Sequence, residues 1–301
     1  RDVEARYEAA LARLEEADKA PSAAPAASAT SATSATSSND DVYAWRILRT
    51  RAIGGADSPG NRGALSLDDV MAGSPLWAVV SNFQINGHTF KKYCSPLLSV
   101  ERLIIFHGCA RSARDLRSCA PNATIYDMTP KKLSFGFKND YGCHHSKAFF
   151  IGFEDSLRVA ITNLISCDIN NKSQGIWMQD FPIKKAGAPS TSDFEEQLVK
   201  YFLSLQKHAA RMPQSWRGLG AAFGDDEQLT IAQALRKFDF SGAKARLVAS
   251  TPGYHSGADL HSFGVNRVAA VLAKEGAGGQ KADDQIYCQF SSFSSPTTPH
   301  V

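Results

Sequence analysis

The chain has 301 residues, of which 43% are hydrophobic, 10% aromatic and 21% charged, a composition that suits one large or two ordinary folded domains. No run approaches about 18 consecutive apolar residues, which excludes a membrane-spanning helix. The first residues have neither an initiator methionine nor the layout of a secretory signal, so we expect a fragment or a processed product. The six cysteines are widely spaced and form no CxxC pair, which predicts reduced thiols in an intracellular protein without a structural zinc site.

The net charge of +3 is unevenly distributed along the chain. Residues 1–41 carry four basic and eight acidic side chains, a net charge of −4, so the remainder carries +7. A mildly basic body suits an anionic ligand such as nucleic acid. Because so small a balance is also common in proteins that bind no charged ligand, charge alone does not decide the question.

Residues 1–41 are predicted to be an extension of the folded part. Residues 1–19 are rich in Ala, Glu, Arg and Leu, which predicts a charged, mostly solvated helix. Residues 21–38 are almost entirely Ser, Ala, Thr and Pro, too few apolar side chains to offset chain entropy, and we expect a disordered linker there. From Val42 onward the composition is globular, so residues 42–301 are predicted to form the second unit.

Within residues 42–301, short apolar runs alternate with helical patterns, which predicts an α/β fold built in layers. The predicted strands are 76–80, 103–106, 124–126, 147–153, 157–161, 246–249 and 286–290. A helix is predicted to begin near Ser192, where Ser192 and Glu195 form a capping box. Its buried side consists of the apolar residues at helical spacing, Phe194, Leu198, Tyr201, Phe202 and Leu205. Further helices are predicted at 229–236 and 263–274, and glycine-rich loops at 54–63 and 276–279.

The densest group of reactive side chains lies at residues 141–147, where the predicted strand 147–153 begins. Side chains alternate along a strand, so His145 and Lys147 are predicted to share a face and to meet one ligand. An ammonium neutralises phosphoryl oxygens and opposes protonation of the imidazole, which leaves a neutral histidine as a nucleophile. A bare HxK occurs often by chance, and hydrogen-bonded bystander histidines are the alternative interpretation.

Two amide side chains extend this group. The strand 157–161 ends just before Asn163, and Gln174 follows Asn163 by eleven residues. In a hairpin the start of one strand lies beside the end of the next, so Asn163 is predicted to lie near His145 and Lys147. Neutral amides at these positions would donate to phosphate oxygens without adding charge.

The ordered set of motifs resembles the tyrosyl-DNA phosphodiesterase type I family, a branch of the phospholipase D superfamily. The segments that carry the resemblance are 145–147, 157–159, 163–165 and 174–177, with shorter matches at 63–66, 105–108, 250–253 and 289–292. Phospholipase D motifs generally place an aspartate five residues after the lysine, and Gly152 stands there instead, which favours the DNA-repair branch over lipid hydrolysis. The resemblance implies a phospholipase D-like α-β-α sandwich that is one of two pseudo-symmetric lobes.

The resemblance also implies roles for single residues. His145 matches the histidine that attacks the 3′ phosphorus of DNA and forms a phosphohistidine link. Lys147 and Asn163 match the residues that complete this motif and hold phosphate oxygens. Gln174 and Ser292 match further phosphate-contacting positions. The implied activity is hydrolysis of 3′-phosphotyrosyl and related blocked DNA ends.

Tyr141 stands where the family has an aromatic residue that stacks on a DNA base, a contact worth about 1–3 kcal/mol. A half-buried core tyrosine is the alternative for this position. The partners implied are single-stranded DNA 3′ ends and a 3′-linked topoisomerase peptide, with nuclear localisation and no membrane. No metal or other cofactor is expected, because a lysine and amides supply the charge that a divalent ion supplies elsewhere.

Three departures from the family qualify these expectations. The family has a second HxK in its other half, which supplies a general acid and base, whereas this chain has HxK only at His145. We therefore expect the chain to be inactive alone and to need a C-terminal lobe. The segment from Arg158 to Asn163 is about two residues shorter than usual. No tyrosine occupies residues 83–86, where the family uses one in its DNA groove.

Two alternatives stay open at this point. One is a lobe that binds single-stranded DNA without catalysis, through Tyr141, Lys147 and the basic residues Arg111, Arg114, Arg117, Lys131 and Lys132. These five basic residues are by default a solvated face. The other is a different phosphodiesterase of the superfamily, a nuclease or a lipid hydrolase.

Overall fold

The computed structural model describes residues 45–50, 54, 58–129, 143–163, 174–187, 191–208, 214–224 and 228–276. The predicted helix 1–19, linker 21–38 and strand 286–290 lie outside these residues, and so does the predicted boundary at residue 41. Two predicted site residues, Tyr141 and Ser292, lie outside them as well.

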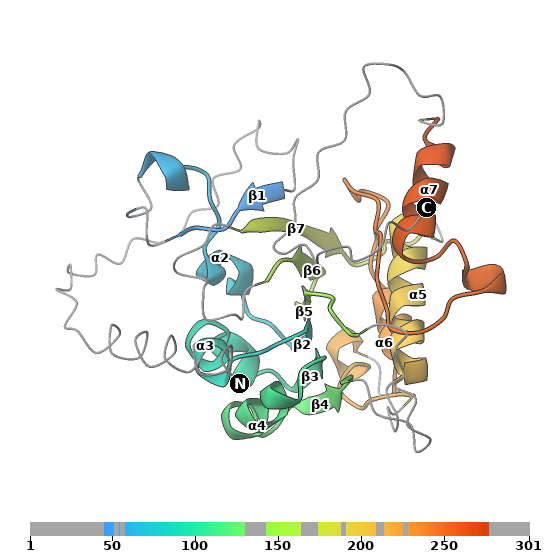
Figure 1. Ribbon diagram of the computed structural model, residues 1–301. Coiled ribbons are helices and arrows are strands. Elements are labelled where there is room, and N and C mark those ends of the chain that lie inside the picture. The colour runs from blue at the N-terminus through green and yellow to red at the C-terminus, as the bar shows by residue number, and fades with distance from the viewer. Residues whose placement is uncertain are drawn as a thin grey trace, which may run out of the picture.

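A seven-stranded mixed sheet forms the centre of the fold, with the strand order β1-β7-β6-β5-β2-β3-β4 (Figure 1). The strands are β1 (Trp45–Ile47), β2 (Trp77–Asn82), β3 (Arg102–His107), β4 (Thr124–Asp127), β5 (Ala148–Gly152), β6 (Ser156–Ile161) and β7 (Gly175–Pro182). β2, β3 and β4 pair in parallel, and all the other neighbours pair antiparallel. The sheet therefore joins a parallel unit to an antiparallel meander through the β2–β5 pair.

Helices cover both faces of this sheet (Figure 1). On one face lie α2 (Leu67–Met71), α3 (Gly87–Tyr93) and α4 (Ala110–Cys119), and on the other lie α5 (Asp193–His208) and α6 (Ile231–Leu235), with α7 (Gly264–Lys274) beside α5. Four short 3-10 helices complete the described elements: Pro59–Asn61, Ser95–Leu98, Ala221–Phe223 and Gly257–Asp259. The buried apolar side chains form two clusters, one on each face of the sheet. The predicted layered α/β architecture is confirmed as a helix-sheet-helix sandwich.

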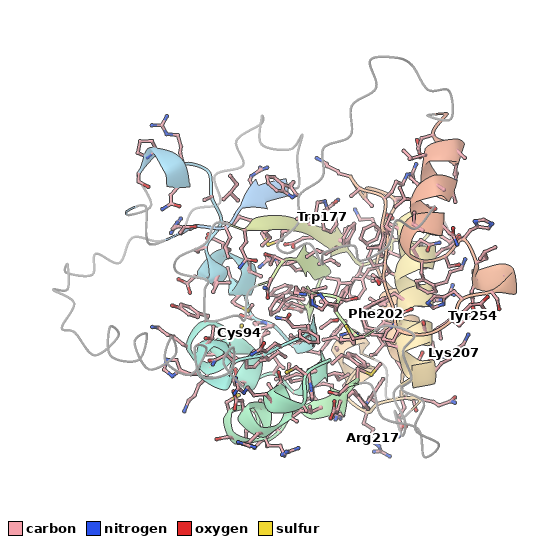
Figure 2. The ribbon with its side chains drawn as sticks, in the orientation of Figure 1. Cys94, Trp177, Phe202, Lys207, Arg217 and Tyr254 are labelled. Atoms are coloured by element: carbon pink, nitrogen blue, oxygen red, sulfur yellow. The ribbon has the colours of Figure 1, made fainter. Side chains whose placement is uncertain are left out.

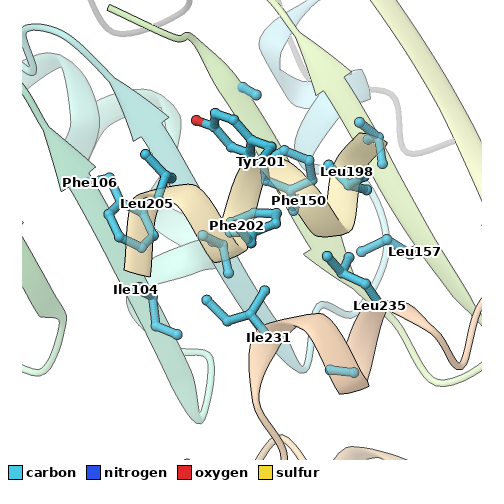
Figure 3. Close-up of a cluster of buried hydrophobic side chains, with 14 of the residues drawn as sticks. Ile104, Phe106, Phe150, Leu157, Leu198, Tyr201, Phe202, Leu205, Ile231 and Leu235 are labelled. Atoms are coloured by element: carbon cyan, nitrogen blue, oxygen red, sulfur yellow. The ribbon is translucent and has the colours of Figure 1, made fainter. Parts of the chain in front are cut away.

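The long helix α5 packs as its spacing predicts. All five apolar residues of its predicted buried side are at most 4% exposed, and Figure 3 shows four of them, from Leu198 to Leu205, between the helix and the sheet. Figure 2 shows Phe202 on the side of α5 that faces the sheet, and Lys207 and Tyr254 on the outer side. The predicted cap is half formed, because Ser192 Oγ accepts from Glu195 N at 3.2 Å while Glu195 Oε2 accepts from Lys184.

Arg158 of β6 ties the sheet to the end of α2. Its guanidinium forms a two-pronged pair with Asp180 of β7, with both distances 2.8 Å. It also donates to the backbone carbonyls of Asp69, Val70 and Ala72, at 3.2, 3.1 and 2.8 Å. These carbonyls have no partners within the helix, so one arginine satisfies the C-terminal end of α2.

Five of the predicted strands are confirmed, with boundaries shifted by one or two residues, and both further predicted helices are present as α6 and α7. The predicted strand 246–249 is wrong. Ala249 is buried, but its carbonyl accepts from Gly264 N, and the neighbouring Ser250 carbonyl accepts from a serine side chain, so this segment pairs with none of the strands that the structure describes. Part of the predicted loop 54–63 is the 3-10 helix Pro59–Asn61. Among the helices that the structure describes, none is both long and apolar enough to cross a membrane.

Candidate active site at one edge of the sheet

The sheet topology brings the ends of several strands to one edge. β5 runs antiparallel to β2 and β6, and its first residue, Ala148, pairs with Ser81 of β2 and Ile161 of β6. The residues just before β5 therefore lie beside the ends of β2 and β6. The predicted hairpin of β5 and β6 is confirmed, and it places the segment before Ala148 next to the segment that leads to Asn163.

His145 and Lys147 meet at this edge. Lys147 Nζ lies 2.7 Å from His145 Nδ1 and donates to the carbonyl oxygen of His145 at 2.9 Å. The predicted strand begins one residue later than expected, at Ala148, so the pair lies in the extended segment that precedes β5. The imidazole of His145 is exposed, and its Nε2 has no hydrogen-bond partner among the described residues. The two side chains therefore share a side, as predicted, and in addition they contact each other.

The electrostatics of the pair keep the imidazole neutral. Burial and then the charge of Lys147 lower the pKa of His145. Burial also lowers the pKa of Lys147, while Cys143 acts in the opposite direction. An ammonium group has only hydrogens to donate, so the 2.7 Å contact is a hydrogen bond from Lys147 to the Nδ1 lone pair. At neutral pH the proton of the neutral ring therefore lies on Nε2.

Phe83 is a site residue that the sequence did not reveal. Its ring stacks on the His145 imidazole, with ring centroids 4.7 Å apart and planes inclined by 27°. Gly108 is hydrogen-bonded to Phe83 through the backbone, since its N–H donates to the Phe83 carbonyl at 2.9 Å. A Cβ at Gly108 would overlap the carbonyl oxygen of His144 and lie 2.9 Å from the Phe83 ring. The segment where the family tyrosine is absent thus supplies a phenylalanine that stacks on His145.

Asn163 reaches the same edge through Asn82, the last residue of β2. Asn82 Nδ2 donates to Asn163 Oδ1 at 3.4 Å, and Asn82 is fully buried with its own Oδ1 unpartnered. Among the described residues none accepts a hydrogen bond from the amide nitrogen of Asn163. Asn82 was not predicted, although a polar residue at the end of a buried apolar strand is the signal that marks it.

Gln174 stands immediately before β7. Its backbone carbonyl accepts from Leu48 N at 2.7 Å, which fixes the residue at the start of the strand. The β6–β7 pairing ends with Ile161 opposite Trp177, so Asn163, just after β6, and Gln174, just before β7, follow the same edge of the sheet. Within the described residues the structure forms no hydrogen bond between Gln174 and the His145–Lys147 pair.

Gly152 stands where related motifs have an aspartate, and its surroundings explain the glycine. A Cβ there would overlap the indole of Trp77, which is 1% exposed and part of the core. A carboxylate at this position has no room and would enter apolar surroundings. No cluster of three or more His, Cys, Asp or Glu side chains that suits a metal ion occurs in the part of the chain that the structure describes.

The other residues considered for DNA binding are basic, and three of them are arginines of α4. Arg111, Arg114 and Arg117 are all exposed on this helix, which begins just after the edge that carries the site. Lys131 and Lys132 lie outside the described residues.

A family model and the sequences of known relatives point to the same protein family. Residues 46–300 match the family model for tyrosyl-DNA phosphodiesterase. The chain is 31% identical over 245 residues to tyrosyl-DNA phosphodiesterase 1 of Arabidopsis thaliana, covering 78% of this chain and 37% of the relative. It is 27% identical over 230 residues to a probable tyrosyl-DNA phosphodiesterase of Caenorhabditis elegans, covering 74% and 46%. The chain thus spans less than half the length of each of these two relatives.

The fold agrees with the same family. A crystal structure of a mutant yeast tyrosyl-DNA phosphodiesterase matches with a TM-score of 0.51 at 16% identity, covering 76% of this chain and 48% of that chain. At such low identity the match speaks for the fold alone. The expected phospholipase D-like fold is confirmed.

Proposed function

This chain belongs to the tyrosyl-DNA phosphodiesterase family, and from that premise we propose that it carries the nucleophilic half of a DNA-repair phosphodiesterase site. The proposed reaction is hydrolysis of 3′-phosphotyrosyl and related 3′-blocked DNA ends through a phosphohistidine on His145. The observation that carries the proposal is the contact of 2.7 Å between Lys147 Nζ and Nδ1 of an exposed, neutral His145. A neutral imidazole beside an ammonium suits attack on an anionic phosphodiester.

The proposed attack begins with a change of partner for Lys147. A phosphodiester next to the pair offers the ammonium an anionic acceptor, which makes a stronger hydrogen bond than Nδ1 does. Once Lys147 has moved to a phosphate oxygen, Nδ1 can take the ring proton, and the Nε2 lone pair is free to attack phosphorus. The Nε2–P bond forms as the P–O bond to tyrosine breaks, and the tyrosyl oxygen leaves with the bonding electrons and needs a proton.

The amides complete the phosphate site in this proposal. Asn163, held by Asn82, donates its amide hydrogens to the phosphate oxygens, and Gln174 and Ser292 supply further donors. Tyr141 stacks on a base near the 3′ end. The leaving peptide is the topoisomerase remnant linked through its tyrosine.

The second histidine of the mechanism has no counterpart in the 301 residues, which contain HxK once. In the proposal a further HxK, from outside these residues, protonates the tyrosyl oxygen and then activates the water that hydrolyses the phosphohistidine. The chain alone should therefore expel a tyrosyl oxygen poorly and leave any phosphohistidine unhydrolysed.

A substrate with a better leaving group tests this proposal directly. Nitrophenolate leaves without a general acid, so the chain should release one nitrophenolate per chain from an oligonucleotide that ends in 3′-(p-nitrophenyl phosphate), and then stop. His145→Ala should abolish this burst. His261→Ala, which removes another exposed histidine, serves as the matched control and should leave it unchanged. A burst of equal size in His145→Ala would sink the nucleophile assignment.

A second candidate function is binding of single-stranded DNA without chemistry. It is favoured by the arginines of α4, because Arg111, Arg114 and Arg117 are all exposed and three residues apart on a helix that begins at the site edge. The double variant Arg114→Glu with Arg117→Glu should weaken binding of a fluorescent oligonucleotide and flatten its salt dependence. Unchanged affinity together with a normal nitrophenolate burst would reject the binding function and leave the catalytic one.

A further inference from the structure

A line of buried polar side chains lies directly behind His145. Tyr201 Oη of α5 lies 2.8 Å from Ser81 Oγ of β2, and Ser81 Oγ lies 3.0 Å from His144 Nε2. Ser81 and His144 are completely buried, and Tyr201 is 4% exposed. On this face of β2 the other side chains, Trp77 and Val79, are apolar core residues, so Ser81 is a polar exception that α5 and His144 satisfy.

The hydrogens of this line can be placed one by one. A serine hydroxyl has one hydrogen and two lone pairs. Ser81 directs its hydrogen at the carbonyl oxygen of Ser146, over a long 3.5 Å. With Ser81 donating there, its two lone pairs can accept from Tyr201 O–H and from the Nε2–H tautomer of His144. Burial raises the pKa of Tyr201 and lowers that of His144 to about 4, so both groups stay uncharged at neutral pH.

Both chain neighbours of His145 are held by hydrogen bonds to other parts of the fold. His144 is fixed by Ser81, and its carbonyl packs against Gly108. Ser146 donates from its hydroxyl to the Ser250 carbonyl at 2.8 Å. Side chains alternate in extended backbone, so anchoring residues 144 and 146 on the inner side directs His145 to the opposite side, where the Phe83 ring lies.

We propose that Tyr201, Ser81 and His144 are positioning residues that hold the His145 imidazole against the Phe83 ring and beside Lys147. They touch neither substrate nor the reacting atoms, and they act through the backbone on either side of the nucleophile. This inference rests on the proposed function for its meaning in catalysis, but the geometry it assigns to His145 exists without substrate. A displacement of a reacting atom by about 1 Å costs about a hundredfold in rate, which is why such a support is valuable at a nucleophile.

Nuclear magnetic resonance of the chain with labelled histidines tests the positioning without any substrate. The Phe83 ring, stacked 4.7 Å from His145, should displace the His145 ring-proton resonances upfield. Tyr201→Phe deletes one oxygen and Ser81→Ala deletes another, and each should move these resonances toward those of a solvent-exposed histidine. Tyr126→Phe is the matched control, because Tyr126 is a buried tyrosine of the same core whose hydroxyl takes no part in the hydrogen bonds of Ser81, His144 and Ser146. It should leave the resonances in place.

His144→Gln provides a rescue experiment, because its amide retains an N–H donor for Ser81, whereas His144→Leu does not. The His145 resonances should stay close to wild type in the first variant and shift in the second. In the nitrophenolate assay, Tyr201→Phe should slow the burst about tenfold, as expected for one lost hydrogen bond, without changing its size.

The outcomes distinguish a failure of the positioning role from a failure of the proposed function. If Tyr201→Phe and Ser81→Ala leave the His145 resonances as unmoved as Tyr126→Phe does, the positioning role is overturned, whatever the burst shows. If the resonances move as expected but wild-type protein gives no burst, the positioning stands and the proposed function fails. Should Ser81→Ala not fold, Tyr201→Phe alone decides, since it leaves the volume of the core almost unchanged.

Discussion

Acid should destabilise this fold through His144. This histidine is completely buried, and burial is the main cause that lowers its pKa from 6.5 to about 4, followed by the charges of His107, Lys147 and His145. The unfolded chain exposes the same imidazole with an ordinary pKa. Between these two values the unfolded state binds a proton that the folded state excludes, so the free energy of unfolding must fall as the pH falls.

The size of the effect follows from the two pKa values. Above pH 6.5 the titration of His144 changes the free energy of unfolding very little. That free energy falls by about 2 kcal/mol between pH 7 and pH 5, and by about 3 kcal/mol in total once the pH is below 4. Stabilities of whole domains are about 5–15 kcal/mol, so a loss of this size is measurable. His144→Gln removes the titrating group while it keeps a donor for Ser81.

Urea denaturation of both proteins at pH 7 and pH 5 measures the difference. Wild type should lose about 2 kcal/mol more than His144→Gln over this interval. His107 also has a pKa lowered by burial, but it is present in both proteins and cancels in the comparison. An equal pH dependence in the two proteins would refute the reasoning, because it would mean that His144 accepts a proton as readily in the folded as in the unfolded chain.

Three further predictions follow from the packing and the charges. Gly152→Ala should lower the free energy of unfolding by about 1–3 kcal/mol in urea titrations, because the new methyl group overlaps the Trp77 indole; a neutral effect would show that the indole yields freely. Arg158→Lys should cost about 1–3 kcal/mol in the same assay, since an ammonium cannot keep both the two-pronged carboxylate pair and the contacts to the end of α2; unchanged stability would contradict that role. Lys147→Met should raise the pKa of His145 toward its ordinary value, so the acid limb of its reactivity moves to higher pH, and a His145 titration by nuclear magnetic resonance that shows no rise would count against the charge argument.

The shared side of His145 and Lys147 was predictable because it depends on local geometry. Residues two positions apart in extended backbone have their side chains on the same side. The hairpin that follows is short enough for its two strands to be recognised in the sequence. The buried side of α5 was predictable for the same kind of reason, since the period of its apolar residues matches a helix.

The surroundings of His145 were not predictable in this way. Phe83, Ser81 and Asn82 reach the site only because β2 pairs with β5 across more than sixty residues of chain, and no local pattern specifies that pairing. The segment 246–249 is apolar enough to suggest a strand, but its carbonyls at Ala249 and Leu247 accept from Gly264 and Arg267 of α7 instead. A hydrophobic run alone does not distinguish these two situations.

In the proposed reaction His145 becomes covalently bonded to phosphorus. The most direct test is to react the chain with the 3′-(p-nitrophenyl phosphate) oligonucleotide, digest the product at neutral or mildly basic pH to preserve an acid-labile phosphoramidate, and locate the DNA adduct by mass spectrometry. The proposed phosphohistidine reaction should give a single adduct on the peptide that contains His145, and none in His145→Ala. An adduct on any other residue, or release of nitrophenolate with no adduct at all, would contradict it.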